Sequence, residues 1–157
     1  MKITRHILDN GLRLVHSRDE STQMVALNIL YNVGARDEHP EHTGFAHLFE
    51  HLMFGGSVNI PDYDMPLQLA GGENNAWTNN DITNYYLTVP RQNVETGFWL
   101  ESDRMLSLDF SERSLEVQQL SLIHIYHNVY IALLPCSRTS VYTTPGGYGQ
   151  ILLRLQL

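Results

Sequence analysis

The sequence predicts a fold of the α/β or α+β class, because segments with strand periodicity and segments with helix periodicity alternate along the chain. Residues 24–34, "MVALNILYNVG", alternate apolar and polar positions as a half-buried strand does. Residues 43–54 and 93–106 instead carry apolar residues at helical spacing. With 157 residues, the chain is long enough for one domain with a hydrophobic core.

The first half of the chain begins with a predicted β-hairpin over residues 2–17. Asn10-Gly11 is a strong turn pair between two β-prone runs. The strand at 24–34 is expected to place five apolar residues on one buried face: Val25, Leu27, Ile29, Tyr31 and Val33. A polar loop over residues 35–43 follows it.

The second half adds four predicted elements. Residues 63–72 form a short helix that ends at glycines, and residues 82–90 form a strand rich in β-branched and aromatic residues. Residues 93–106 fit an amphipathic helix. Ser111 is the expected cap of a further helix that begins at "SERSLEVQQ".

Composition excludes several classes of protein. The net charge of −7 argues against nucleic acid as a partner. No apolar run is long enough to span a bilayer, and residues 1–10 lack the apolar core of a signal peptide. The single cysteine, Cys136, rules out an internal disulfide framework.

The predicted helix at 43–54, "TGFAHLFEHLMF", carries the most distinctive residues. Thr43 is the expected N-cap and Gly55-Gly56 the expected stop. At about 100° per residue, His47, Glu50 and His51 share one helical face. Four apolar residues fall on the opposite face, where they are expected to pack against a sheet: Phe45, Leu48, Phe49 and Leu52.

This face is suited to metal chemistry. Two histidines at positions i and i+4 can present imidazole nitrogens to one Zn²⁺ at about 2.0–2.1 Å. Glu50, one residue before His51, would sit beside the metal and accept a proton from the water that attacks a peptide carbonyl. The order H-x-x-E-H is the inverzincin pattern, the inversion of H-E-x-x-H. The alternative is a structural helix whose two partly buried histidines include one paired with Glu50.

A family resemblance supports the interpretation of this helix as a metal-binding element. "GFAHLFEHLMFGGS" followed by "AGGENNAWTNNDITNYY" resembles the N-terminal catalytic domain of the insulinase/pitrilysin-type zinc metallopeptidases. "NILYNVGARDEHPEHTG" agrees, so the resemblance covers the chain from about Leu8 to about Gln118. It implies an α+β fold, an α/β sandwich with helices packed on a mixed, mainly antiparallel sheet.

The resemblance also implies an activity and its residues. The activity is that of a zinc metalloendopeptidase, with His47 and His51 as zinc ligands and Glu50 as the general base. Asn75 and Ala76 match an edge-strand element that aligns the substrate backbone, as in β-augmentation. The implied partners are a peptide substrate and a second peptidase domain or subunit. Both the periplasm and the cytoplasm of a bacterium stay open as locations.

One part of the family pattern is missing. The third zinc ligand of such a site is a glutamate roughly 70 to 80 residues after the second histidine. The corresponding window, residues 121–131, holds no carboxylate, and Glu116 lies about two helical turns too early. His124 and His127 are weak substitutes. We therefore expect negligible peptidase activity from this chain.

The missing ligand coincides with a change of composition. All 17 acidic residues lie between Asp9 and Glu116. "LSLIHI", residues 120–125, matches the translation of a transposon-adapter DNA used in library preparation. We therefore predict that residues 1–119 are the N-terminal part of a peptidase domain, and that residues 120–157 are an adapter-derived or frameshifted tail. Resequencing the source locus tests this, since a genomic frame that continues through "LSLIHIYHNVY" contradicts it.

Two other functions remain as alternatives. S-ribosylhomocysteine lyases also carry an H-x-x-E-H helix with a later functional cysteine, for which Cys136 is the candidate. A non-catalytic, substrate-binding subunit of a peptidase pair is the second. Activity on a peptide rather than on a ribosyl thioether would distinguish a peptidase from the lyase. Stoichiometric zinc in the full-length parent protein would distinguish a peptidase from the non-catalytic subunit.

Overall fold

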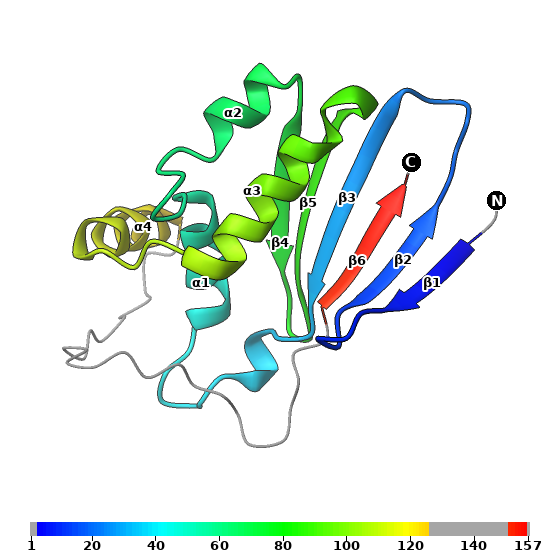
Figure 1. Cartoon of the computed structure of the whole chain (residues 1–157). Helices are drawn as coiled ribbons and strands as arrows, with labels where there is room; N and C mark the ends of the chain where they lie inside the picture. The colour runs from blue at the N-terminus through cyan, green and yellow to red at the C-terminus, as the bar shows by residue number, and fades with distance from the viewer. Residues whose placement is uncertain (1–2, 126–150, 157) are drawn as a thin grey trace.

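A computed structural model describes residues 3–125 and 151–156 of the chain. Six strands of this part form one sheet in the order β1-β2-β6-β3-β5-β4 (Figure 1). The strands are β1 (Ile3–Ile7), β2 (Arg13–Ser17), β3 (Met24–Tyr31), β4 (Glu73–Thr78), β5 (Thr83–Pro90) and β6 (Ile151–Gln156). All neighbouring strands pair antiparallel except β2 and β6, which are parallel.

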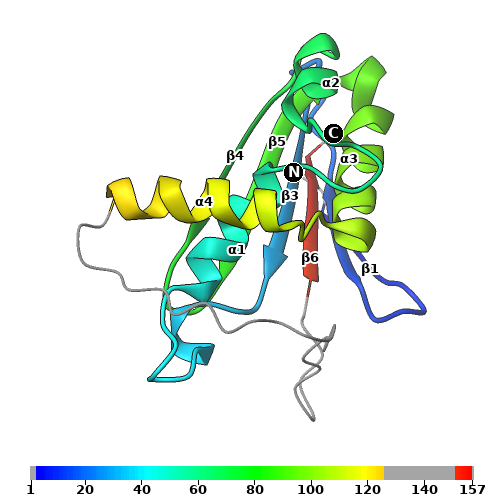
Figure 2. The same ribbon diagram turned by 90° about the vertical axis from the view of Figure 1, so that its left-hand side faces the viewer.

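The helices pack beside this sheet and against each other. They are α1 (Phe45–Phe54), α2 (Asp64–Leu69), α3 (Val94–Ser107) and α4 (Glu112–Ile125), with 3₁₀ turns η1 (Ala35–Asp37) and η2 (Arg91–Asn93). α3 lies across one face of β3 and β5, whereas α4 crosses α1 beyond the β4 edge (Figure 1, Figure 2). The predicted α+β fold, with its mixed and mainly antiparallel sheet, is confirmed.

Most predicted elements are present. The hairpin forms between β1 and β2, and Gly11 adopts a φ of 86°, which a glycine turn residue allows without strain. The predicted cap of the last helix is also present, because the Ser111 Oγ accepts a hydrogen bond from the Ser114 amide at 3.2 Å. β6 was not expected from the sequence, although it pairs with both β2 and β3.

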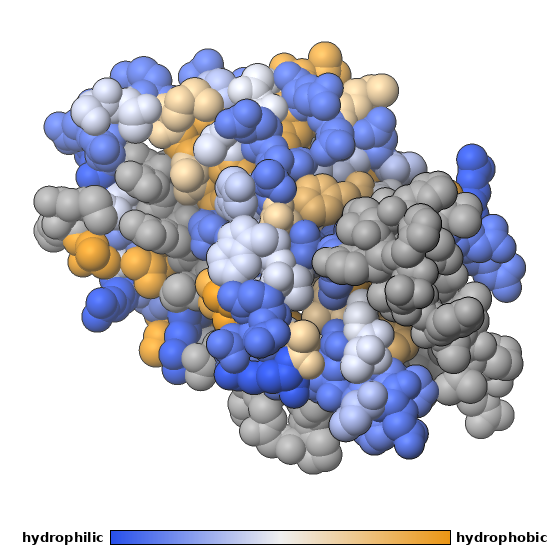
Figure 3. All heavy atoms as spheres, turned by 180° about the vertical axis from the view of Figure 1, so that it is seen from behind, coloured by the Kyte–Doolittle hydropathy of each residue, from blue (hydrophilic) through white to orange (hydrophobic). Residues whose placement is uncertain are grey.

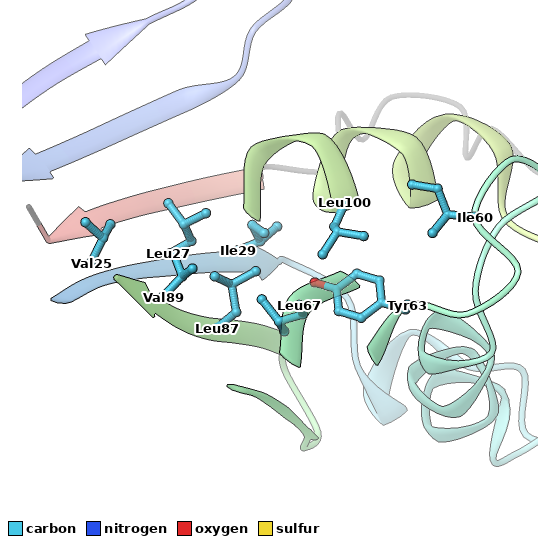
Figure 4. Close-up of a cluster of buried hydrophobic side chains, with 9 residues drawn as sticks. All are labelled: Val25, Leu27, Ile29, Ile60, Tyr63, Leu67, Leu87, Val89 and Leu100. Atoms are coloured by element: carbon cyan, nitrogen blue, oxygen red, sulfur yellow. The ribbon is translucent and has the colours of Figure 1, made fainter. Parts of the chain in front are cut away.

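The core lies between the sheet and α3. Val25, Leu27 and Ile29 on β3 are fully buried, and Leu100 of α3 points toward them (Figure 4). Each such side chain contributes about 1.5–3 kcal/mol on burial. Val33 was expected on the same face, but it follows the end of β3 and is 45% exposed. The alternation predicted from the sequence therefore holds only within the strand.

The opposite face of the sheet is more polar. Figure 3 shows hydrophilic residues over most of the coloured surface on this side, with small apolar patches between them. The register of β3, β5 and β4 places Asn28, Tyr86 and Asn75 in one row across this face. An antiparallel sheet with one face packed and the other solvated has this alternation.

A buried ion pair connects the core to α1. Arg104 donates to Glu101 through Nη2 at 2.6 Å and Nε at 2.9 Å, and both side chains are almost fully buried. The Tyr63 hydroxyl donates to Glu101 Oε1 at 2.5 Å, and Arg104 also stacks on the Tyr63 ring. A third contact of Arg104 runs through Nη1 to the Met53 carbonyl at 3.3 Å, in the last turn of α1. The guanidinium therefore donates hydrogen bonds both to a buried carboxylate and to a carbonyl at the C-terminal end of α1.

Candidate metal centre

The start of α1 differs from the expectation. Thr43 was predicted as the N-cap, but the helix begins at Phe45 and Gly44 is its N-cap, with a φ of 94° and no side-chain cap. The carboxylate of Glu38 takes that role, accepting from the amides of Gly44 and Ala46 at 2.7 Å each. The first amides of a helix need acceptors, and a carboxylate there also complements the helix dipole.

Removing this acceptor gives a first prediction. We expect Glu38→Ala to lower the free energy of unfolding by about 1–2 kcal/mol, because two helix amides lose their acceptor. Glu41→Ala is the matched control, since Glu41 is exposed in the same loop. Urea denaturation of both variants measures the difference. Equal stabilities for the two variants would show that the Glu38 contacts are not stabilising.

The end of α1 is as predicted. Gly55 is the C-cap, and its amide donates to the Leu52 carbonyl at 3.0 Å. Gly56 follows with a φ of 95°, a conformation that other residues rarely adopt. Together with the Met53–Arg104 contact, this turn fixes the C-terminal end of the helix.

The apolar face of α1 packs differently from the prediction. Leu48 and Leu52 are buried, but they pack against Leu108 and Leu115, so their partners lie on α4 and the segment before it rather than on the sheet. The other two apolar residues of this face, Phe45 and Phe49, are 39% and 45% exposed. The helical period therefore placed Leu48 and Leu52 correctly on a buried side, whereas Phe45 and Phe49 are not covered, and the period cannot indicate which neighbour packs there.

The predicted ligands lie together on the other side of α1. His47 Nε2 and His51 Nε2 are 3.2 Å apart. Two nitrogens bound to one tetrahedral zinc at about 2.0–2.1 Å lie about 3.3–3.4 Å apart, so these imidazoles fit the ion with little movement. The two nitrogens are also within hydrogen-bond distance of each other, and the tautomers decide which one donates.

The surroundings of His51 favour the neutral ring. Burial and the neighbouring His47 lower the pKa of His51, while Glu50 and a hydrogen bond with Gln118 act in the opposite direction. Metal binding requires a deprotonated imidazole nitrogen. A lowered pKa therefore reduces the competition between protons and a metal ion at this ring.

Glu50 faces an open groove between α1 and β4. The groove has a volume of about 510 Å³. Its lining includes His47 and Glu50 from α1, and Ala76 and Trp77 from β4. A carboxylate that shares a groove with a metal-competent imidazole can reach a proton on a bound water or substrate.

The second predicted element, Asn75-Ala76, lies on β4 at the edge of the sheet. The Ala76 amide donates to Asn75 Oδ1 at 2.8 Å, so a side chain occupies this backbone donor. An edge strand offers unpaired backbone groups to an added strand. The position of these two residues is that expected of a peptide-binding edge, and their role stays a prediction.

The "VGARDE" segment fastens the loop before α1 to the turn after β4. Ala35 and Arg36 donate their amides to the carbonyls of Asn79 and Asn80 at 3.1 and 2.9 Å. Gly34 makes this approach possible, because a Cβ there would lie 2.4 Å from the Asn79 oxygen. The loop that carries Glu38 is thus held against the strand that borders the groove.

A second prediction follows from this close approach. We expect Gly34→Ala to destabilise the protein by about 1–3 kcal/mol, because backbone atoms must move to admit the methyl group. Gly11→Ala serves as a comparison, since nothing lies within 4 Å of a Cβ at that position and only its positive φ is strained. Thermal unfolding measures both. A smaller loss at Gly34 than at Gly11 would contradict the packing argument.

Other candidates from the sequence lie apart from this pair or outside the described part. Among residues 3–125 and 151–156, no group of three potential ligands is placed to hold a metal ion. The backbone of His124 lies on α4, but its side chain, His127 and Cys136 are outside the described residues. Glu116 is exposed on α4. Sequence reasoning missed Glu38, although its place just before the helix in "ARDE" was a usable signal.

The α+β fold, the facing histidines and the neighbouring carboxylate are typical of metal-dependent hydrolases. The chain belongs to the insulinase family (peptidase family M16), whose family model matches residues 13–130. The predicted boundary at residues 119 and 120 stays a prediction. Within the part that the structure describes, no helix is both long and apolar enough to cross a membrane.

Individual relatives agree with the family. The zinc protease PqqE of Helicobacter pylori is 33% identical over 67% of this chain and 24% of that protein. The coenzyme PQQ synthesis protein F of Pseudomonas aeruginosa is 34% identical over 71% of this chain and 15% of that protein. An uncharacterized zinc protease of Bacillus subtilis, YmxG, is 27% identical over 74% of this chain and 29% of that protein. The chain therefore spans less than a third of these relatives.

Two solved structures have a similar fold. A protease from Helicobacter pylori superposes with a TM-score of 0.74 and 29% identity, over 79% of this chain and 30% of that one. Pitrilysin superposes with a TM-score of 0.72 over 79% of this chain and 14% of that one. Its 21% identity supports the fold alone.

Proposed function

We propose that this chain supplies two zinc ligands and the general base of a zinc-dependent endopeptidase. The observation that carries the proposal is the 3.2 Å separation of His47 Nε2 and His51 Nε2, with Glu50 on the same groove. Membership of a family whose relatives are named zinc proteases supports the choice of zinc and of peptide hydrolysis.

Each residue then has a distinct task. His47 and His51 hold the ion, which supplies Lewis acidity toward a peptide carbonyl when bound. Glu50 accepts the proton of the attacking water and passes it to the leaving amine. β4 aligns an extended peptide along its free edge, which reads backbone more than side chains.

The partners of this centre are a peptide and a further peptidase domain or subunit. A catalytic zinc site takes three protein ligands and keeps one open position. Two are assigned within the described residues, so we expect this chain alone to bind zinc weakly and to hydrolyse peptides negligibly.

Equilibrium dialysis with zinc and a quenched fluorescent peptide assay test the proposal together. At zinc concentrations that saturate a weak site, we expect about one zinc per chain, lost in the His47→Ala, His51→Ala double variant, and no measurable hydrolysis. Hydrolysis that depends on both zinc and Glu50 would overturn the expected inactivity and keep the peptidase assignment. Wild-type protein that binds no more zinc than the double variant would overturn the assignment itself.

A second candidate function is a non-catalytic, substrate-binding subunit. It is favoured by one observation, that residues 3–125 and 151–156 contain no group of three ligands. A binding subunit needs the β4 edge and not the histidine pair. Peptide binding that is unchanged in the double histidine variant, with no zinc bound by the wild type, would favour this candidate.

A further inference from the structure

The contact between Asn75 and Ala76 lies on the edge strand that the proposed function assigns to the peptide. β4 is the last strand of the sheet (Figure 1), and its register pairs Asn75 with Tyr86 of β5. Amides along such a strand point alternately toward the neighbouring strand and away from it. The Ala76 amide hydrogen is directed at Asn75 Oδ1, with 2.8 Å between nitrogen and oxygen, so this amide points away from β5. A side chain of the same strand therefore already occupies a donor that an added strand would use.

This donor belongs to the groove that holds the candidate catalytic residues. Ala76 lines the groove of about 510 Å³ together with His47 and Glu50. An extended peptide that pairs with β4 would place one of its carbonyl oxygens on the Ala76 amide. The occupied donor is therefore the point on the edge at which a side chain of the protein and the peptide backbone need the same hydrogen.

The Asn75 side chain has room to leave this amide. It borders a second hollow on the solvated face of the sheet, with a volume of about 170 Å³. Glu73 from β4 and Tyr86 and Thr88 from β5 also line this hollow. Asn75 and Tyr86 lie opposite each other on the two strands, and both are exposed. Rotation about the side-chain torsions of Asn75 therefore moves its amide group from the edge into open space above Tyr86.

We propose that Asn75 is a gate on the peptide-binding edge: its side-chain oxygen occupies the Ala76 amide in the free protein, and a backbone carbonyl of the bound peptide displaces it. This inference rests on the proposed function for the peptide as the ligand. The exchange replaces one N–H···O hydrogen bond by another of the same kind, so the two oxygens compete for one hydrogen. The occupied amide also makes the exposed edge a poorer template for pairing with other chains. The strength of the side-chain acceptor therefore sets the affinity for the peptide.

An NMR titration of the metal-free protein with an uncharged, capped peptide rich in valine and threonine tests the gate. Asn75→Ala removes the competing oxygen, so we expect the peptide to bind about 2–10-fold more tightly than to the wild type. Asn75→Asp keeps the side-chain shape and supplies a charged, stronger acceptor, so we expect binding about 2–10-fold weaker. Asn74→Ala is the matched control, because the Asn74 side chain donates to Asp64 at 2.8 Å and accepts from no strand amide. Its affinity should equal that of the wild type.

Hydrogen exchange of the Ala76 amide gives a second readout that needs no peptide. Relative to its intrinsic rate, we expect this amide to exchange faster in Asn75→Ala than in the wild type, and to be protected in both once the peptide is bound.

Two results would overturn the gate. One is peptide binding that is no tighter in Asn75→Ala than in the wild type, which includes binding by neither protein. The other is an Ala76 exchange rate that the substitution leaves unchanged. Both measurements are made without metal, so a wild-type chain that binds no zinc would overturn the proposed catalytic function separately from the gate.

Discussion

Arg104→Met is expected to lower the free energy of unfolding by about 3–5 kcal/mol, the largest stability effect that the structure implies. The substitution leaves the Glu101 carboxylate buried without its cation, and desolvation of an unpaired charge is costly. It also removes the donor to the Met53 carbonyl at the end of α1. Urea denaturation followed by circular dichroism measures the loss.

The control is an arginine–glutamate ion pair on the protein surface. Arg18 and Glu20 form an exposed ion pair at 3.3 Å, so Arg18→Met should change stability by less than about 1 kcal/mol. The double variant Arg104→Met, Glu101→Gln should regain part of the stability, because no buried charge is left unpaired. Similar losses for Arg104→Met and Arg18→Met would contradict the importance of burial.

His51→Ala is expected to weaken zinc binding by more than about 100-fold, the largest effect on the proposed function. Loss of a residue that only supports a ligand costs about 10–100-fold, and loss of the ligand itself costs more. His47→Ala should have a similar effect, since the two nitrogens share one position for the ion. Competition with a fluorescent zinc chelator measures the affinities.

The Glu50→Gln variant tests whether Glu50 is a proton acceptor or a metal ligand. Glu50 lies on the same groove as His47, but no three-ligand group is placed around it within the described residues. We therefore expect this variant to keep zinc affinity within a few fold of the wild type. A loss as large as that of His51→Ala would show that Glu50 is itself a ligand.

Much of the fold could be predicted from local patterns. Period-two alternation located β3, the Asn10-Gly11 pair located the first hairpin, and Gly55-Gly56 ended α1. These signals act within a few residues, so the sequence alone displays them. β6 could not be placed in this way, because its neighbours β2 and β3 lie more than a hundred residues away along the chain.

The candidate site, like the fold, could be predicted only where local sequence determines it. The i, i+4 spacing brought His47 and His51 together, since a helix fixes that relationship locally. The supporting contacts of Glu38 and Arg104 come from two other segments, and they depend on tertiary packing. Thr43 was a reasonable N-cap by residue type, but a longer carboxylate from the preceding loop reaches the same amides.

X-ray absorption at the zinc edge, on the chain loaded with one equivalent of zinc, measures the centre most directly. We expect two imidazole nitrogens at about 2.0–2.1 Å, with the imidazole scattering lost in the His47→Ala, His51→Ala double variant. A spectrum without imidazole ligands, or one that is the same in the double variant, would contradict the claim that these two side chains hold the ion.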